Sequence, residues 1–492
     1  MPSKVSIDPI TRLEGHGRID IFMDDAGKVE HAYLIVPELR GFELFSLGRP
    51  AEDMPQITSR ICGVCPTAHH MASTKALDDL WHVDPPRAAK LIREFNYNTF
   101  MLEDHALHFY VLGGPDFIVG PKAPPMERNI LGVVAKVGAE TGLKVIGMRK
   151  KLRGILATLG GKVINPVFGL PGGVSKPIPK ELKDEWKAIA KEGLDFALFT
   201  HKALEDIVLA NKEYVDLITS DAYTHKTYYM GLVDDNNKTN FYNGKLRVVD
   251  QTGKELVKFD IHDYLNQIGE HVEPWTYMRF PYLKKVGWKG FVDGPDSGVM
   301  AVAPLARINA ADGFATPRAS ELREVFFKTL GGRPCHMTLA NHWARVIEMV
   351  YAAERMNELL ADDEIYSDTV RTIPTEKPTV GIGVVEAPRG SLIHHYETDE
   401  KGLLTKVNLI VATAHNAARM ALGVDKAAKA FVKGPTIDQG TLNLIEMTFR
   451  AYDPCDACAT HSLPGETPLI FNFRRSSDGS VIKQVSANDV RK

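Results

Sequence analysis

Four of the five cysteines in the 492-residue chain form two C-x-x-C motifs near its opposite ends. Cys62 and Cys65 lie in RICGVCP, and Cys455 and Cys458 lie in DPCDAC. This spacing lets both sulfurs of a pair face one point, so the two pairs together can offer four thiolates to one soft metal ion. The motifs therefore predict a metal centre that joins the two ends of the chain inside the fold. Cys335 belongs to neither motif and is expected to be a buried free thiol.

Several kinds of centre use such a ligand set. A structural zinc site, an iron–sulfur cluster and a catalytic thiolate-bound transition metal all fit the spacing, whereas a redox dithiol needs no second pair. Structural zinc is typical of small domains that depend on the metal for folding, and a chain of 492 residues has core enough without it. From the residues alone, the metal alternatives stay open.

The composition argues against several other functions. Lys and Arg number 59 against 62 Asp and Glu, and there is no basic block, so nucleic acid is not an expected partner. No apolar run approaches the roughly 18 residues of a membrane helix, and the start does not resemble an export signal, so we expect a cytoplasmic chain without a membrane span. No P-loop or G-x-G-x-x-G motif supports nucleotide binding.

The elements that would position the cysteines are mostly helices. Apolar residues recur near the helical period over residues 87–113, where Gly113-Gly114-Pro115 ends the pattern. Alternating apolar and polar residues predict a hairpin over 17–36 and strands over 379–411, and an aromatic and β-branched stretch over 224–300 predicts a strand-containing insertion. We expect a mainly α fold with small β elements (α+β), a long-helix bundle whose further helices span about 127–158, 181–212, 337–361 and 435–450.

The motifs and their flanks resemble the large subunit of nickel–iron hydrogenases, specifically the cytoplasmic multimeric group. The segments RICGVCPTAHH, DPCDACATH, TRLEGHGRI and RGFE give the resemblance, which spans Thr11 to His461. It implies reversible oxidation of H2 to protons and electrons. It also implies one large catalytic domain over 1–461, with the hairpin and first loop in 1–60, rather than the three units that length suggests. Residues 462–492 correspond to an extension that a maturation endopeptidase removes.

The same resemblance implies two metal sites. All four cysteines would bind nickel, and Cys65 and Cys458 would also bridge to an iron that carries carbon monoxide and cyanide. Glu43 in RGFE, the backbone carbonyl of Leu409 and His461 correspond to ligands of a second ion, magnesium or iron. No cysteines remain for an iron–sulfur cluster within this chain.

The residues expected around the centre are also implied by the resemblance. Glu14 would accept the proton released when H2 is split. The guanidinium of Arg389 would lie over the open face of the metals, held by Asp104 and Asp453. Without the resemblance, Glu14 would be interpreted as a surface carboxylate and Asp104 as a solvated helix charge.

Further groups complete the expected surroundings. His69 would hydrogen-bond a bridging sulfur, and Pro388 and Thr413 would lie against the cofactor, with the Thr413 hydroxyl contacting cyanide. His105 and His108 are expected to be core or supporting histidines.

Electrons must leave through another protein. The resemblance implies an iron–sulfur small subunit, together with further acceptor subunits through which electrons pass to heterodisulfide reductase, NAD(P) or F420. Two alternatives are a structural Zn(Cys)4 protein and a non-catalytic relative such as the quinone-site subunit of the respiratory NADH complex. The latter branch lacks the cysteine pairs.

Overall fold

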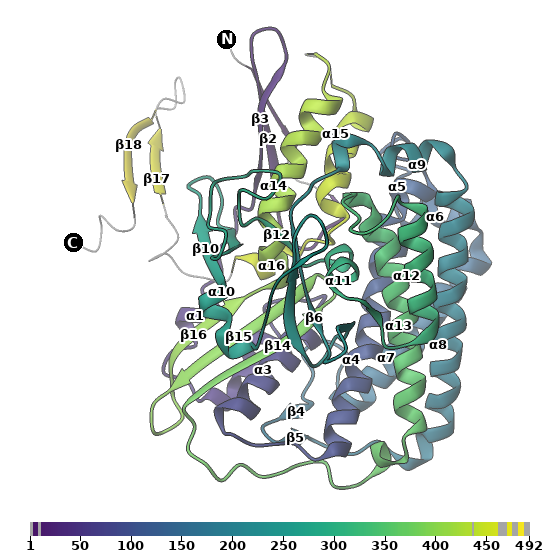
Figure 1. The fold of residues 1–492 in the computed structure, drawn as a ribbon, viewed down its shortest axis with the longest axis vertical. Helices are drawn as coiled ribbons and strands as arrows, with labels where there is room; N and C mark the ends of the chain where they lie inside the picture. The colour runs from purple at the N-terminus through teal and green to yellow at the C-terminus, as the bar shows by residue number, and fades with distance from the viewer. Residues whose placement is uncertain (1–2, 8–10, 435–436, 461–469, 475–480, 487–492) are drawn as a thin grey trace.

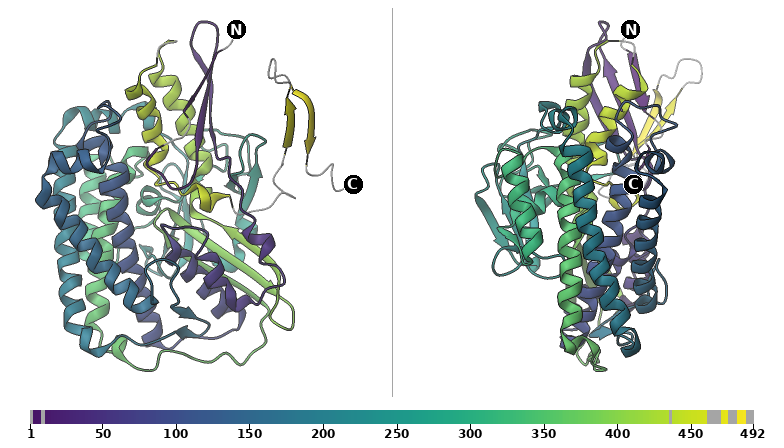
Figure 2. Two further views of the ribbon diagram at one scale, coloured as in Figure 1. Left: turned by 180° about the vertical axis from the view of Figure 1, so that it is seen from behind. Right: turned by 90° about the vertical axis from the view of Figure 1, so that its right-hand side faces the viewer.

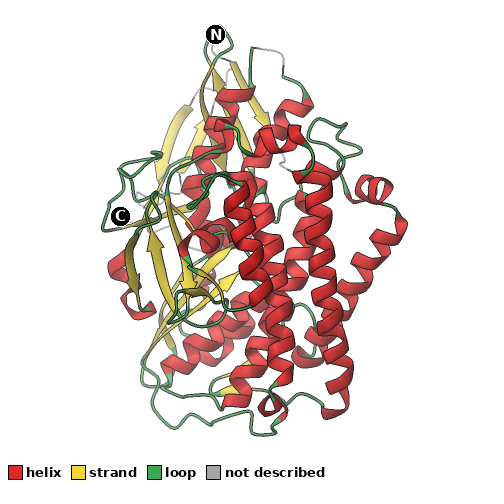
Figure 3. Ribbon diagram, turned by 45° about the vertical axis from the view of Figure 1, so that its right-hand side comes forward, coloured by secondary structure: helices red, strands yellow, loops and turns green. Residues whose placement is uncertain are grey.

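The computed structural model describes residues 3–7, 11–434, 437–460, 470–474 and 481–486. Long helices form a bundle along one side of the molecule, and small sheets lie on the other side (Figure 1, Figure 3). This arrangement confirms the predicted mainly α fold with small β elements.

The bundle is built around α13 (Asn341–Ala361). This helix packs against α4 (Arg87–Leu107), α8 (Lys183–Leu204) and α12 (Pro317–Thr329), and α7 (Ala139–Gly160) packs against α4 in turn. The long axes of these helices run nearly parallel in the side view (Figure 2). Most side chains of α13 are buried, because the helix has neighbours on several sides.

Some helix boundaries differ from those predicted. Instead of one helix over 127–158, Gly138 with φ of +87° separates α6 (Ile130–Val137) from α7. Glycine permits this left-handed backbone, and its effect on the chain is invisible to the apolar period. Elsewhere α4 runs on into a π-helical turn over His108–Gly113, and α8 is followed by a similar turn over Glu205–Leu209 and then by α9 (Lys212–Ile218).

Two helices next to the predicted metal centre were not predicted. These are α3 (Pro66–Leu80) and α14 (Ala412–Phe431), and most of their residues are buried. A helix covered on several sides has no polar face, so its sequence lacks the alternation on which the prediction depended. The predicted helix over 435–450 is confirmed as α15 (Gln439–Arg450).

The predicted strands over 379–411 form the antiparallel sheet β14 (Val380–Ala387), β15 (Gly390–Thr398) and β16 (Leu404–Ile410). Helix α3 lies directly on β14. A Cβ on Gly381 or Gly383 would stand 2.1 Å from a carbonyl oxygen of α3, so only glycine allows this close approach. The contact fixes the first cysteine motif, which precedes α3, against the sheet.

The stretch over 224–300 contains the predicted strands. Its sheet pairs β6 (Tyr228–Val233) with β8 (Lys245–Val249), and Met230 of β6 shares an apolar core with Val384 of β14 and Ile393 of β15. The strands of the insertion therefore pack onto the sheet that leads to Arg389. The other strands in this stretch and just after it are β7 (Lys238–Thr239), β9 (Glu255–Phe259), β10 (Ile268–Val272), β11 (Arg279–Leu283), β12 (Met300–Ala301) and β13 (Gly313–Phe314).

The ends of the chain form two further sheets. The predicted N-terminal hairpin is confirmed as β2 (Arg18–Met23) and β3 (Val29–Ile35), and β1 (Ser3–Ile7) adds a strand that was not predicted. In the C-terminal stretch, β17 (Ile470–Arg474) pairs with β18 (Val481–Ser486). Within the described ranges, no helix is long and apolar enough to cross a membrane.

Candidate metal centre

The two cysteine motifs meet in the interior. The Sγ atoms of Cys62 and Cys455 lie 3.2 Å apart, and those of Cys65 and Cys458 lie 3.7 Å apart. All four sulfurs are buried and fall within 4.8 Å of one another. Four sulfurs around one metal ion at the usual bond length of about 2.3 Å need a similar separation. The predicted convergence of the two ends of the chain is therefore present.

Two N-terminal residues hold the motifs together. The Arg40 guanidinium donates to the carbonyl of Ile61 in the first motif and, at 2.8 Å, to that of Ala457 in the second. Glu14 pairs with Cys455 as a parallel bridge, and its carbonyl accepts the Asp456 N–H at 3.0 Å. The N-terminal segment thus joins two motifs that are far apart in sequence.

The thiols cannot all ionise by themselves. Burial opposes ionisation, yet hydrogen bonds from the other thiols lower the pKa of Cys62 well below its usual value, and the backbone N–H groups of Val64 and Cys65 also point at its sulfur. Burial and the neighbouring thiols raise the pKa values of Cys455 and Cys458 well above the usual range. A bound cation would remove this conflict, because it stabilises several thiolates at once. The donor set therefore fits a soft metal.

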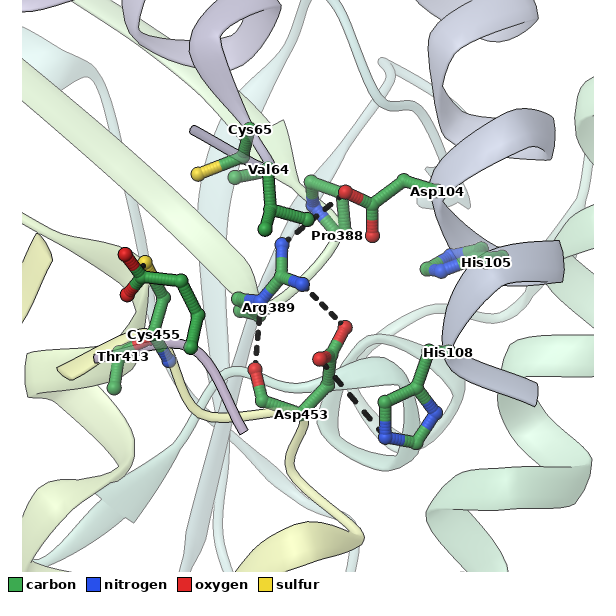
Figure 4. A network of polar contacts seen from close by, with 12 residues as sticks. Val64, Cys65, Asp104, His105, His108, Pro388, Arg389, Thr413, Asp453 and Cys455 are labelled. Carbon is green, nitrogen blue, oxygen red and sulfur yellow. Dashed lines mark hydrogen bonds and ion pairs between the residues drawn. The ribbon is translucent and has the colours of Figure 1, made fainter. Parts of the chain in front are cut away.

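Arg389 occupies the short turn between β14 and β15, with its guanidinium between Asp104 and Asp453 (Figure 4). Its Nε donates to the Asp453 carbonyl at 2.6 Å, and Nη2 lies 2.8 Å from the Asp453 carboxylate. On the other side, Nη1 lies 3.3 Å from Asp104 Oδ2. Burial raises the pKa of Asp104 to about 7 in spite of Arg389. The two carboxylates predicted to hold Arg389 both contact it.

Glu14 lies beside a sulfur. Its Oε2 accepts a hydrogen bond from Cys455 Sγ at 2.9 Å and from the Ala457 N–H at 3.2 Å. Burial, followed by the negative charge of Cys62, raises the pKa of Glu14. The carboxyl group is thus placed to exchange a proton with the sulfur.

His69 starts a buried hydrogen-bonded chain. Its Nε2 lies 3.4 Å from Cys458 Sγ, and its Nδ1 lies 3.2 Å from Nε2 of His394. His394 Nδ1 lies 2.6 Å from the Tyr396 hydroxyl, which lies 2.9 Å from Ser73 Oγ. Each partner constrains the ring orientation of the next, so His69 is held in a fixed position against the sulfur.

Thr413 and Pro388 also lie at the centre (Figure 4). The Thr413 hydroxyl accepts the Cys455 N–H at 3.1 Å, and the Pro388 carbonyl accepts a hydrogen bond from Arg307 at 3.1 Å. His105 and His108, also expected to support the site, are buried and bond Glu348 and the Arg450 carbonyl respectively.

Two of the three residues predicted for the second metal site are in contact. Glu43, on α1 (Phe42–Phe45), accepts the N–H of Leu409 on β16 at 2.7 Å. His461 lies outside the described residues. Thr460, immediately before it, accepts the Arg40 N–H at 2.8 Å, so the described chain reaches the segment that contains Glu43.

Comparison with known proteins decides the family. A family model described as nickel-dependent hydrogenase matches residues 40–127 and 134–461, and one described as HoxL-like matches residues 4–39. The chain belongs to the nickel-dependent hydrogenases. Its predicted family and enzyme class are confirmed.

Named relatives cover nearly the whole hydrogenase chain. An iron-sulfur subunit of the F420-non-reducing hydrogenase of Archaeoglobus profundus is 46% identical, over 98% of this chain and 99% of the relative. A vhu subunit of the F420-non-reducing hydrogenase of Methanocaldococcus jannaschii is 44% identical, over 87% of this chain and 100% of the relative. A crystal structure of NAD+-reducing [NiFe]-hydrogenase in the H2-reduced state is 37% identical with a TM-score of 0.88, covering 93% of this chain and 99% of that one. These matches do not favour the structural-zinc or quinone-site alternatives.

Several residues beside the hydrogenase centre were not predicted. One is the partly buried Arg40, and the others are buried charged or polar groups: Arg307, Glu348, Glu386, His394 and Tyr396. One signal was available, since Glu348 interrupts an otherwise apolar helical stretch, and a charge there is rarely buried without a partner. Nothing in the sequence identifies those partners, because they come from distant segments.

Proposed function

We propose that this hydrogenase subunit oxidises H2 reversibly to protons and electrons at a nickel–iron centre. Cys62 and Cys455 would be terminal ligands, while Cys65 and Cys458 would bridge to an iron with carbon monoxide and cyanide ligands. The observation that supports this most is the convergence of four buried sulfurs within 4.8 Å. When bound, the metals supply the Lewis acidity that splits H2.

Arg389 would hold positive charge over the metals. Its guanidinium is oriented by Asp104 and Asp453, which contact it from two sides. A planar cation with a fixed orientation stabilises charge that develops as H2 is polarised, without having to reorganise. Pro388 and Thr413 would complete the pocket for the diatomic ligands.

Glu14 would move the proton. Its Oε2 lies 2.9 Å from Cys455 Sγ, within reach of direct transfer. The raised pKa allows the carboxyl to hold a proton and then release it outward. His69 would donate to Cys458 and keep that sulfur in place.

A second ion, magnesium or iron, would be bound by Glu43, the Leu409 carbonyl and His461. The contact between Glu43 and the Leu409 backbone supports this proposal. The carboxylate and carbonyl oxygens suit a hard cation that keeps part of its water shell.

Electrons would leave near the first motif. Gly63 is exposed and Val64 is partly exposed, whereas the cysteines on either side of them are buried. The centre thus approaches the surface at this loop, and we place the iron–sulfur small subunit there, followed by further acceptor subunits. Removal of residues 462–492 by an endopeptidase and a cytoplasmic location stay predictions.

Elemental analysis and infrared spectroscopy of the purified complex test the proposal. We expect about one nickel per chain, together with infrared bands of carbon monoxide and cyanide. Cys455→Ser should abolish both, whereas Cys335→Ser, which changes a buried thiol away from the centre, should keep them. Stoichiometric zinc with no such bands would contradict the proposal.

A further inference from the structure

Arg307 has an unusually complete set of hydrogen-bond acceptors. It lies on α11 (Pro304–Ala310) with its side chain fully buried. Nε and Nη2 bind the two oxygens of Glu348 at 2.6 and 2.5 Å, and Nη1 lies 3.0 Å from Glu386 Oε2. The two remaining N–H groups bind main-chain carbonyls. All five donors of the guanidinium are therefore used.

Those two carbonyls belong to the residues immediately before Arg389. Arg307 Nη1 donates to the Ala387 carbonyl at 2.8 Å, and Nη2 donates to the Pro388 carbonyl at 3.1 Å. Because Ala387 pairs with Gly390 across the hairpin, Pro388 and Arg389 make up the whole turn. A bond to each preceding carbonyl thus fixes how far the turn extends toward the thiolates.

The acceptors of Arg307 are fixed in their turn. Glu386 Oε1 accepts the Leu232 N–H at 2.7 Å and the Ser391 hydroxyl at 2.8 Å. Glu348 Oε2 lies 2.9 Å from His105 Nε2. Since His105 directly follows Asp104, which contacts Arg389, the contacts form a closed ring.

A second buried arginine shows that burial alone does not produce this network. Arg345 lies on α13 one turn before Glu348, yet its Nε and Nη1 have no hydrogen-bond partner among the described residues. Arg307, by contrast, grips two glutamates and two carbonyls with a planar fork. Lysine at the same position would supply three donors from one point and could not span these acceptors.

We propose that Arg307 is a positioning residue that sets the location of the Arg389 guanidinium by holding the carbonyls of the Pro388–Arg389 turn. This inference rests on the proposed function, because it matters for turnover only if Arg389 acts at the metals. A displacement of about 1 Å at a reacting centre can lower the rate about 100-fold, so an anchor outside the centre can control it.

A double-mutant cycle in the purified, nickel-loaded complex tests the inference. We expect Arg307→Lys and Arg389→Lys each to lower turnover per nickel by about 10-fold to 100-fold. If Arg307 acts through Arg389, the double variant should stay within about threefold of Arg389→Lys alone. Multiplication of the two effects would overturn the inference.

Infrared spectra supply a readout that does not depend on turnover. Arg307→Lys should shift the carbon monoxide and cyanide bands in the same direction as Arg389→Lys, with nickel and iron content unchanged. Unshifted bands would show that the guanidinium has not moved, which would overturn the inference.

Arg93 offers a matched control. It is also a buried arginine that binds one carboxylate, Asp78, and two main-chain carbonyls, those of Leu170 and Gly173. It lies on the same helix as Asp104 but nearer to the N-terminus, and the two residues are about 16 Å apart along the helix axis. Arg93→Lys should lower thermal stability, yet keep turnover per nickel within about twofold and leave the infrared bands in place.

Two further results separate the possible failures. If Arg389→Lys leaves turnover unchanged, the proposed role of Arg389 fails and Arg307 has nothing to position. If Arg389→Lys lowers turnover but Arg307→Lys does not, only the present inference fails. Should Arg307→Lys not load nickel, Glu386→Gln replaces it, because the amide keeps the Leu232 and Ser391 bonds and removes one acceptor of Arg307. Unchanged bands in that variant would overturn the inference.

Discussion

The two cysteine motifs share one spacing but have opposite surroundings. In the first, Gly63 is exposed, and an added Cβ would meet no atom within 4 Å. In the second, Asp456 and Ala457 are buried, and a Cβ on Gly15 would stand 2.8 Å from the Ala457 nitrogen. The C-x-x-C spacing thus predicts that the two sulfurs of a motif face one point, but it does not predict whether the residues between the cysteines are exposed or buried. The residues between the two cysteines reach the surface in the first motif and are buried in the second.

Side chains added at Gly15 and Gly63 should affect the two motifs very differently. Gly15 has φ of +85° and touches the second motif, so Gly15→Val combines backbone strain with a clash. We expect it to cost about 3 kcal/mol or more and to remove nickel from most chains. Gly63→Ala should retain both stability and nickel. Equal nickel content in the two variants, measured by elemental analysis, would contradict the comparison.

Glu14→Gln tests the chemistry of the second motif. The amide keeps a side chain of the same size but cannot carry the proton, so steady-state H2 oxidation should fall about 100-fold or more with nickel content intact. Glu38→Gln, which changes a partly buried carboxylate that pairs with His16, serves as the control and should stay within about twofold of wild type. Unchanged turnover in Glu14→Gln would rule out Glu14 as the group that accepts the proton.

His70, on the helix that follows the first motif, should make the stability of the protein depend on pH. His70 is held neutral, because its Nε2 accepts the Gly169 N–H at 2.8 Å while its Nδ1 lies 3.1 Å from the Pro55 carbonyl. Burial lowers the pKa of His70 to about 4. Between pH about 6.5 and 4 the unfolded chain binds a proton that the folded chain does not, so the free energy of unfolding falls as pH decreases.

At pH 5 this contribution is about 2 kcal/mol. Denaturation at pH 7.5 and pH 5 should therefore show a smaller loss for His70→Gln than for wild type. An identical pH dependence in His70→Gln and wild type would show that His70 does not titrate as described.

A charge at Gly63 tests whether the exposed part of the first motif contacts a partner. Gly63→Glu places a charge where we propose that the small subunit docks. It should lower H2-dependent reduction of the complex's acceptor about 10-fold at unchanged nickel content, through weaker association. Gly154→Glu alters another exposed glycine with free space around it and should have no such effect. Full co-purification of the small subunit with Gly63→Glu would place the interface elsewhere.

The sequence predicted the parts of the molecule that are visible locally. The cysteine pairs and the regular apolar period of the helix over 87–113 can be recognised without knowledge of contacts. The positions of Glu14, Arg389 and Asp104 followed from resemblance, and the structure brings all three to the centre, although their roles stay proposals. Two adjacent helices, α3 and α14, were missed because burial on several sides removes the polar face that reveals a helix.

The supporting contacts could not be predicted in the same way. Arg307, Glu348 and His394 contact segments that are distant in sequence, and a buried charge reveals its partner only when the fold is known. The π-helical turn at His108–Gly113 was hidden for a related reason. It shifts side chains by a fraction of a turn and leaves the composition unchanged.

The joining of the two motifs by Arg40 has a consequence for biosynthesis. Protein synthesis releases Cys62 and Cys65 before Cys455 and Cys458, and the first cysteines of the two motifs lie 393 residues apart. The intervening helices can fold before the last sulfurs arrive, since domains form as they leave the ribosome. A metal that needs all four sulfurs could therefore bind only after the second motif has been synthesised, and a product truncated before that motif carries only half of the cysteine ligands.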